Sequence, residues 1–211
     1  MRRALCSIGA GPHEALLAVS EPTFRAYADR HGYDLITATD ADPARPPAWA
    51  KVAMLREILA EFDLALWIDA DAVIVDGRDD IAAELEPEKQ LGLVRHGQVP
   101  NTGVMVWRAG EFARSLLAEM WAAKRRIHHP WWENAALLDA LGYPVPSFSR
   151  LPRPRRRPRP SRWLDGVQFL APEWNWSYLA RVSDPRIVHC VGVPVEQRLA
   201  DMRAALEGRL V

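Results

Sequence analysis

Two carboxylates separated by one residue follow a short and wholly apolar stretch of the chain. The stretch covers residues 64–68, and the carboxylates are Asp69 and Asp71. An apolar run of this length predicts a buried strand, and ligands of open α/β sheets bind beyond the carboxyl ends of strands. In extended backbone, residues i and i+2 share a face, so both carboxylates can point at one cation. Oxygen ligands favour Mg²⁺ or Mn²⁺ held jointly with substrate phosphates. A solvated turn is the alternative, because Asp-x-Asp is frequent by chance.

A single histidine, His189, follows the apolar residues Ile187 and Val188 near the end of the chain. A cation held by two carboxylates and a diphosphate can take one neutral imidazole as a further ligand. A lone histidine on an apolar strand is more often a hydrogen-bonded core residue, and the residues alone leave both interpretations open.

Two further groups of polar residues suit a sugar. Asn101 and the threonine after it precede a glycine and an apolar run, where they serve either a turn or the hydroxyls of a sugar. Glu133 and Asn134 follow a pair of tryptophans, Trp131 and Trp132. Aromatic faces stack on pyranose rings while carboxylate and amide groups bind hydroxyls, although the tryptophans suit a core equally well.

The elements that must position these residues alternate along the chain. Apolar runs predict strands at 4–8, 33–37, 64–68, 73–75, 91–95, 103–107 and 187–191. Helical spacing predicts a helix that begins at Ser20 with Pro22 in its first turn, and helices over 49–62, 111–127, 132–141 and 195–206. This alternation predicts a single three-layer α/β/α domain over residues 1–211 with a mixed, mainly parallel sheet.

The net charge of the chain is zero, but it sums two unlike parts. The 211 residues hold 27 Lys+Arg and 27 Asp+Glu, and 49% of the residues are hydrophobic, which excludes a disordered chain. Seven arginines fall between Arg150 and Arg162, where there is no acid, so the rest of the chain is acidic. A neutral chain argues against a general nucleic-acid binder.

Residues 143–163 are rich in arginine and proline. Proline and like charges both resist packing, so we expect a flexible, solvated loop within the domain. One alternative is an arm that makes weak contact with an anionic membrane or acceptor through Arg150–Arg162. Contact with nucleic acid is the other alternative, and the lack of aromatic residues between the arginines disfavours it.

The two cysteines, Cys6 and Cys190, are too few for a disulfide framework and lie in apolar runs. Buried, reduced thiols are typical of the cytoplasm. No stretch approaches the ~20 apolar residues of a membrane helix, and the first apolar run is too short for a signal peptide. We therefore expect a soluble, cytoplasmic protein without a transmembrane segment.

Taken in order, these segments resemble the GT-A glycosyltransferases, specifically the Golgi galactosyl-, mannosyl- and xylosyltransferase family. The resemblance extends over roughly residues 4–193. The matching segments are 27–34 (YADRHGYD), 49–51 (WAK), 66–72 (LWIDADA), 101–104 (NTGV), 131–134 (WWEN) and 187–189 (IVH).

The resemblance implies a Rossmann-like GT-A domain and a metal-dependent glycosyltransferase. The enzyme would move a hexose or pentose from a nucleotide-diphosphate sugar, a UDP-sugar first and a GDP-sugar second, to a hydroxyl of a saccharide or small-molecule acceptor. By the same resemblance, Mn²⁺ or Mg²⁺ is held by Asp69, Asp71 and His189. The nucleotide sugar lies against Ile8, Gly9, Lys51, Asp69, Ala70 and Asn101. The catalytic residues are Asp69, Asp71, Glu133 and Asn134, with Asn101 and the Glu133–Asn134 pair facing the donor sugar and the acceptor.

The family retains the anomeric configuration, and there the departing phosphate itself takes the acceptor proton. Inversion would instead require a general base, for which Glu133 is the candidate. Three departures from the family are expected: no membrane anchor of the kind its eukaryotic members carry, no lysine soon after the C-terminal histidine, since residues 191–194 read VGVP, and an arginine- and proline-rich stretch without a family counterpart. A sugar-nucleotide-binding protein without turnover and an arginine-rich module for anionic surfaces are the alternative functions, and the oligomeric state stays open.

Overall fold

A six-stranded sheet forms the middle layer of the protein, seen in a computed structural model that describes residues 1–42, 44–145 and 159–210. Its strands are β1 (Arg3–Ile8), β2 (Asp34–Ala38), β3 (Leu64–Ile68), β5 (Leu91–His96), β6 (Val99–Arg108) and β7 (Val167–Phe169), in the order β2-β1-β3-β6-β5-β7. The pairs β1–β2, β1–β3 and β5–β7 are parallel, and β3–β6 and β5–β6 are antiparallel. The predicted mixed, mainly parallel sheet is confirmed.

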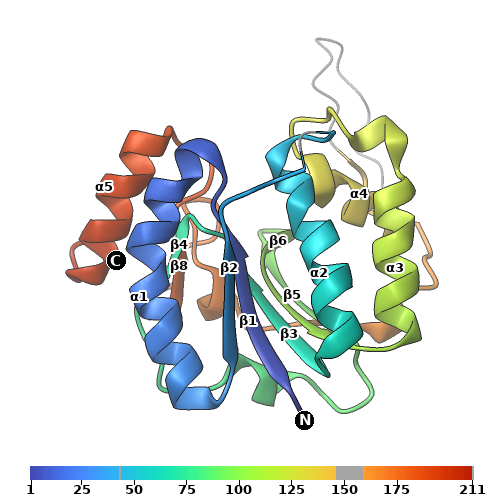
Figure 1. The fold of residues 1–211 in the computed structure, drawn as a ribbon, viewed down its shortest axis with the longest axis horizontal. Helices are drawn as coiled ribbons and strands as arrows, with labels where there is room; N and C mark the ends of the chain where they lie inside the picture. Colours follow the sequence, from blue (N-terminus) through green and yellow to red (C-terminus); the bar gives the residue numbers. More distant parts are fainter. Residues whose placement is uncertain (43, 146–158, 211) are drawn as a thin grey trace.

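Helices cover both faces of this sheet (Figure 1). One side carries α1 (Glu14–His31) and α5 (Val195–Leu206), and the other carries α2 (Ala50–Glu61), α3 (Glu111–Ala122) and α4 (Trp132–Ala140). Short 3-10 turns connect them at Gly11–His13, Pro47–Trp49, Ile81–Glu84, Lys124–Arg126, Leu164–Gly166 and Pro172–Asn175. The expected three layers are therefore present.

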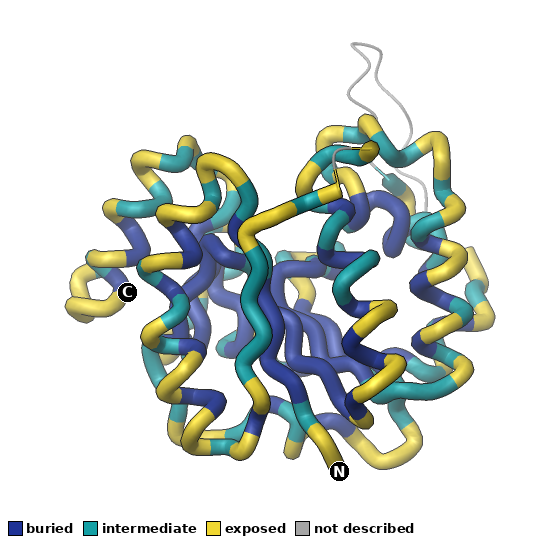
Figure 2. The backbone as a smooth tube through the Cα atoms, in the orientation of Figure 1, coloured by how far each residue is buried: buried dark blue, intermediate teal, exposed yellow. Residues whose placement is uncertain are grey.

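Strand β3 shows why the sheet has two buried faces. Leu64, Leu66 and Ile68 pack in the core shared with α1 and α5, whereas Ala65 and Trp67 pack in the core under α2 and α3. All five are buried, as the side-chain alternation of a strand between two helical layers requires. The central strands are buried along their length, and exposed residues gather on the outer faces of the helices (Figure 2).

A second, two-stranded sheet pairs β4 (Ala72–Ile74) antiparallel with β8 (Ile187–His189). Ala72 lies opposite His189 in this ribbon. The register therefore brings the residue after Asp71 beside the C-terminal histidine, although the two are far apart in the sequence. Helices α1 and α5 pack on this ribbon and fix its position.

The start of α1 differs from the sequence prediction. The helix begins at Glu14 rather than Ser20, and Pro22 lies inside it. Ser20 is not an N-cap, because its buried hydroxyl bonds the carbonyl oxygens of Leu16 and Ala70 at 3.2 and 2.7 Å. The serine thus ties the helix to the residue between Asp69 and Asp71.

Several other elements also differ from the sequence prediction. Strand β6 begins four residues before the expected start, α3 ends at Ala122 instead of 127, and β7 was not predicted at all. Most of the arginine- and proline-rich segment 143–163 lies outside the described residues, so its expected flexibility stays a prediction. Among the described residues, no helix is both long and apolar enough to cross a membrane.

Candidate functional site

The candidate site begins at a turn at the end of β3. The Asp69 N–H donates to the Gly103 carbonyl at 2.8 Å, and the Ala72 N–H donates back to the Asp69 carbonyl at 3.0 Å. The Asp71 carbonyl accepts the N–H of Cys190 at 2.9 Å. The carboxylates are thus brought together by a hydrogen-bonded turn and not by the extended backbone that the sequence argument assumed.

Asp69, Asp71 and His189 form a group in which one ligand atom of each lies within 4.8 Å of the others. His189 Nε2 lies 3.2 Å from Asp71 Oδ1 and 3.8 Å from Asp69 Oδ2. The atom is buried, and among the described residues it has no hydrogen-bond partner, because the contact with Asp71 lacks hydrogen-bond geometry. Buried polar atoms are nearly always paired, so a nitrogen left bare against two carboxylates fits the ligand set of a divalent cation.

Gly103 allows the imidazole to approach the backbone of β6. A Cβ at this position would collide with Cε1 and Nδ1 of His189. The glycine of the Asn-Thr-Gly segment therefore makes room for the histidine ring, a role that its predicted place at the start of a strand did not indicate.

Lys51 lies inside the same cluster and is 4% exposed. Its ammonium contacts Asp69 Oδ1 at 2.8 Å, Glu133 Oε1 at 2.9 Å and the Thr102 carbonyl at 3.0 Å. Thr102 Oγ1 also lies 3.4 Å from the ammonium, so its three N–H groups are surrounded by four acceptor atoms. Burial lowers the pKa of Lys51, but Asp69 and Glu133 together outweigh it and hold the pKa above its ordinary value. The lysine is therefore a buried positive charge that bridges the carboxylates of Asp69 and Glu133.

Arg198, in the first turn of α5, is a member of the site that sequence reasoning missed. Its NH1 lies 2.8 Å from Asp71 Oδ2, and its Nε donates to the Val193 carbonyl at 2.7 Å. Burial raises the pKa of Asp71, but His189 and Arg198 outweigh burial, so the pKa lies below its ordinary value. No local spacing marks this arginine, which is 127 residues from its partner.

The predicted polar residues of β6 and α4 join the cluster through Thr102. The Thr102 N–H donates to Asn134 Oδ1 at 3.0 Å, and its hydroxyl donates to Glu133 Oε1 at 3.0 Å. Asn101 Oδ1 accepts the N–H of Gly103. Asn101, Glu133 and Asn134 therefore lie together, with Glu133 buried and the two asparagines partly exposed.

The other predicted residues lie around this cluster. Ile8 and Gly9 lie at the end of β1, the parallel neighbour of β3, and so at the same edge of the sheet as Asp69. A Cβ at Gly9 would lie 2.6 Å from the His13 carbonyl oxygen, so the backbone there passes close to the start of α1. Ala70 is buried between the two aspartates.

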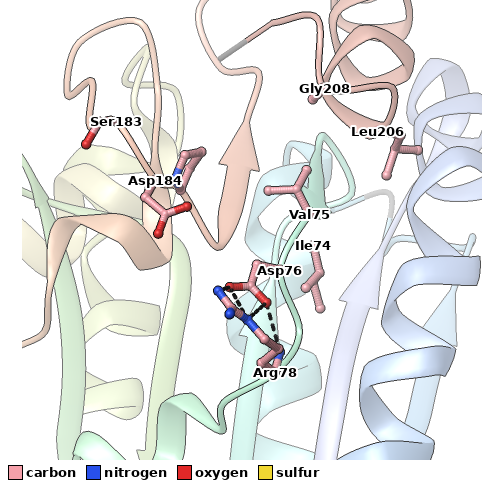
Figure 3. A pocket seen from close by; sticks show the side chains of 10 residues that line it. Ile74, Val75, Asp76, Arg78, Ser183, Asp184, Leu206 and Gly208 are labelled. Atoms are coloured by element: carbon pink, nitrogen blue, oxygen red, sulfur yellow. Dashed lines mark hydrogen bonds and ion pairs between the residues drawn. The ribbon is translucent and has the colours of Figure 1, made fainter.

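Two surface cavities lie away from the cluster. A cavity of about 500 Å³ lies at the opposite end of the β4–β8 ribbon, lined in part by Asp76, Arg78 and Asp184 (Figure 3). A second cavity, of about 470 Å³, adjoins the first, and Ile74, Val75, Asp76 and Arg78 line both. Arg78 and Asp76, which line both cavities, already bind each other at 2.7 Å. The convergence of polar side chains, and not cavity size, marks the candidate site.

Comparison with known proteins agrees with the fold. The model of the galactosyl transferase GMA12/MNN10 family matches residues 11–96, a span that includes Asp69 and Asp71. No curated protein sequence matches the chain. A glycosyltransferase involved in the glycosylation of the major capsid of PBCV-1 superposes with a TM-score of 0.67 at 16% identity, over 95% of this chain and 98% of that one. The chain has a GT-A glycosyltransferase fold.

Two further solved structures share this GT-A fold. The galactosyltransferase LgtC, in complex with donor and acceptor sugar analogs, has a TM-score of 0.58 at 12% identity, over 96% of each chain. The glycosyltransferase GlyE of Streptococcus pneumoniae has a TM-score of 0.56 at 13% identity, over 90% of this chain and 55% of that one. Identities this low establish the fold alone. The family model covers less than half of the chain, so the comparisons establish the GT-A fold that the resemblance predicts.

Proposed function

We propose that this protein is a glycosyltransferase that uses a divalent cation and a nucleotide-diphosphate sugar. The donor is a UDP-sugar in the first place and a GDP-sugar in the second, and a hexose or pentose passes to a hydroxyl of a saccharide or small-molecule acceptor. The observation that carries the proposal is the buried, unpartnered Nε2 of His189, which faces Asp69 and Asp71.

Asp69, Asp71 and His189 would hold the cation. A nitrogen ligand beside two carboxylates supports Mn²⁺ ahead of Mg²⁺, which proteins bind almost entirely through oxygen. A bound divalent cation neutralises the negative charge that grows on a departing diphosphate.

The charges of the cluster support an anionic ligand. Asp69, Asp71 and Glu133 carry three negative charges, and Lys51 and Arg198 carry two positive ones. The cluster is therefore negative by one unit and would become positive by one unit with a divalent cation. A positively charged, half-buried site attracts a diphosphate, so cation and nucleotide are expected to bind together.

Two amide groups are placed to bind sugar hydroxyls. The Oδ1 atoms of Asn101 and Asn134 accept backbone N–H groups of Gly103 and Thr102, so each amide NH₂ points the other way. Among the described residues neither NH₂ has a partner, and both side chains are partly exposed. We assign these donors to the donor sugar or the acceptor.

Glu133 is a poor general base in this arrangement. Its Oε1 already accepts from the Lys51 ammonium and the Thr102 hydroxyl, and the residue is 5% exposed. A carboxylate that serves as the counter-ion of a buried lysine is not free to take an acceptor proton. This supports retention of the anomeric configuration, in which the departing phosphate takes that proton, over inversion.

The test is a screen of UDP- and GDP-sugars for Mn²⁺-dependent hydrolysis and thermal stabilisation. We expect stabilisation by UDP with Mn²⁺ and hydrolysis of at least one donor. Asp71→Asn should abolish hydrolysis, whereas the matched control Asp79→Asn, at an exposed carboxylate paired with Arg186, should retain it. Stabilisation without hydrolysis of any donor would favour the binding protein without turnover. No stabilisation by either nucleotide would overturn the proposal.

The cytoplasmic location and the weak contact of Arg150–Arg162 with an anionic surface stay predictions. Cys6 and Cys190 are both free and buried, which supports the former. Burial raises the pKa of Cys190 to about 12, so this thiol stays protonated and unreactive.

A further inference from the structure

A line of hydrogen bonds leads from the backbone of β6 to the imidazole of His189. It passes through Asn101 and then Asn175, which is fully buried at the end of a 3-10 turn, Pro172–Asn175. From this line we infer that Asn175 is a positioning residue that fixes the tautomer of His189, with the proton on Nδ1 and the lone pair of Nε2 directed at Asp69 and Asp71. The inference extends the proposed metal site. The role of the tautomer in metal binding rests on the proposed function, but the tautomer itself can be measured in the metal-free protein.

The first step fixes the orientation of Asn101. The N–H of Gly103 lies 2.8 Å from the side-chain atom Oδ1 of Asn101. A backbone N–H can only donate, so the atom that faces it must be the amide oxygen and not the NH₂.

The second step fixes the orientation of Asn175. Its Nδ2 donates to the same Asn101 Oδ1 at 2.9 Å. A carboxamide oxygen has two lone pairs and accepts both bonds, but it cannot face a second oxygen favourably. The NH₂ of Asn175 therefore points at Asn101, and its Oδ1 points the other way, at His189.

The third step fixes the proton on the imidazole. Asn175 Oδ1 lies 3.0 Å from His189 Nδ1. A carboxamide oxygen only accepts, so Nδ1 carries the hydrogen. In a neutral imidazole the other nitrogen is then bare, and this nitrogen is the buried Nε2 that has no hydrogen-bond partner among the described residues. The opposite tautomer would place two lone pairs, those of Nδ1 and Asn175 Oδ1, against each other, whereas the Nε2 lone pair, 3.2 Å from Asp71 Oδ1, becomes favourable once a cation lies between the two atoms.

A second histidine provides a built-in comparison. His96 Nε2 lies 3.1 Å from the backbone carbonyl oxygen of Asn175, and the Ser177 hydroxyl lies 3.4 Å from His96 Nδ1. The carbonyl oxygen only accepts, so His96 carries its proton on Nε2. One residue thus holds two neighbouring histidines in opposite tautomers, His189 through its side chain and His96 through its backbone.

The tautomers are measured directly with ¹⁵N-histidine-labelled, metal-free protein at pH 8, in long-range ¹H–¹⁵N correlation spectra. His189→Gln and His96→Gln assign the two rings. We expect His189 with the proton on Nδ1 and His96 with the proton on Nε2. A metal-free wild-type spectrum with the His189 proton on Nε2 and none on Nδ1 would overturn the inference without the need for any variant.

Asn175→Leu removes the acceptor for Nδ1 at similar side-chain volume. We expect His189 to lose its single tautomer, while His96 keeps the proton on Nε2 because the backbone carbonyl remains. Asn101→Asp is the matched control: its carboxylate still accepts from Gly103 and Asn175, so His189 should keep the proton on Nδ1. An unchanged His189 in Asn175→Leu would overturn the assignment to Asn175.

Mn²⁺ binding, followed by water-proton relaxation, connects the tautomer to the site. Loss of a partner that orients a metal-ligating histidine typically weakens metal affinity about 10–100-fold, and we expect this range for Asn175→Leu. A wild-type protein with the expected tautomers but no affinity for Mn²⁺ would contradict the proposed function and leave the role of Asn175 intact. Equal Mn²⁺ affinity in wild type and Asn175→Leu, with changed tautomers, would show that the positioning has no effect on metal binding and would overturn that role.

Discussion

Removal of Arg198 is expected to change cation binding and nucleotide binding in opposite directions. The guanidinium lies 2.8 Å from Asp71 Oδ2, so it competes with a metal for the same carboxylate. In Arg198→Gln that carboxylate loses its protein counter-ion, and the cluster gains one unit of negative charge. Free Mn²⁺ should then bind more tightly. Nucleotide should bind less tightly, since the arginine is the cation of the cluster best placed to meet a diphosphate once a metal takes Asp71.

The magnitude follows from the geometry. Two unit charges 4 Å apart interact with about 4 kcal/mol at an effective dielectric constant of about 20. The Arg198 side chain is 19% exposed and that of Asp71 10% exposed, so solvent screens part of this energy. We expect about 1–2 kcal/mol of net competition, which is about a 5–30-fold gain in Mn²⁺ affinity. Loss of a charge-assisted hydrogen bond to the diphosphate should weaken UDP binding about 10-fold or more at saturating Mn²⁺.

The assay is titration calorimetry with Mn²⁺ alone and then with UDP in excess Mn²⁺. Arg203→Gln, at an exposed position of the same helix, is the matched control for loss of an arginine and should change neither affinity. Arg198→Lys keeps the charge and should leave the affinity for free Mn²⁺ near that of the wild type. Weaker or unchanged Mn²⁺ binding in Arg198→Gln, in a protein that melts like the wild type, would refute the competition.

Three further perturbations test the surroundings of the site. Gly103→Ala should displace the His189 ring and lower Mn²⁺ affinity at least 10-fold, at a stability cost of about 1–3 kcal/mol for the overpacked contact; unaltered affinity by relaxation titration would contradict the close approach. Lys51→Met leaves Glu133 buried without its cation and should cost about 3–5 kcal/mol of unfolding free energy in urea, with partial recovery in the Lys51→Met/Glu133→Leu double variant. Arg78 holds the pKa of Asp76 at about 2, against an ordinary value of 3.8, so this carboxylate adds stability above about pH 4 that is lost as the pH falls to about 2. Asp76→Asn should therefore flatten the dependence of stability on pH in that window, and an unchanged slope would show that the ion pair adds nothing.

The strand that ends at Asp69 could be predicted because its pattern is local. Five apolar residues in a row are buried between two helical layers, as expected for a central strand. The start of α1 could not be predicted, since a serine followed by a proline is a helix-start signal, and only the tertiary bond from Ser20 to the Ala70 carbonyl shows why the serine lies inside the helix. Local signals fail where a side chain serves a distant partner.

The candidate site shows the same limit. Asp69, Asp71 and His189 were found through motif order, whereas Arg198 was missed because its partner lies 127 residues away and nothing in its helix is unusual. Asn175 did carry a signal. It is a lone amide between Trp174 and Trp176, and a buried amide needs partners for its donors and its acceptor. Such a residue can be predicted to bond something, but the sequence does not say what.

The two protein cations explain how three carboxylates can lie in one partly buried cluster before any metal binds. Without Lys51 and Arg198, Asp69, Asp71 and Glu133 would repel one another and resist burial. Lys51 is buried and its ammonium is fully hydrogen-bonded, so we expect it to stay in contact with the carboxylates when a metal binds. Arg198 reaches the cluster from one helix at the surface and keeps some contact with solvent, so its side chain can move away from Asp71. A cation that takes Asp71 would release Arg198 at the place where a diphosphate must sit, and the metal and the nucleotide would then each improve the site for the other.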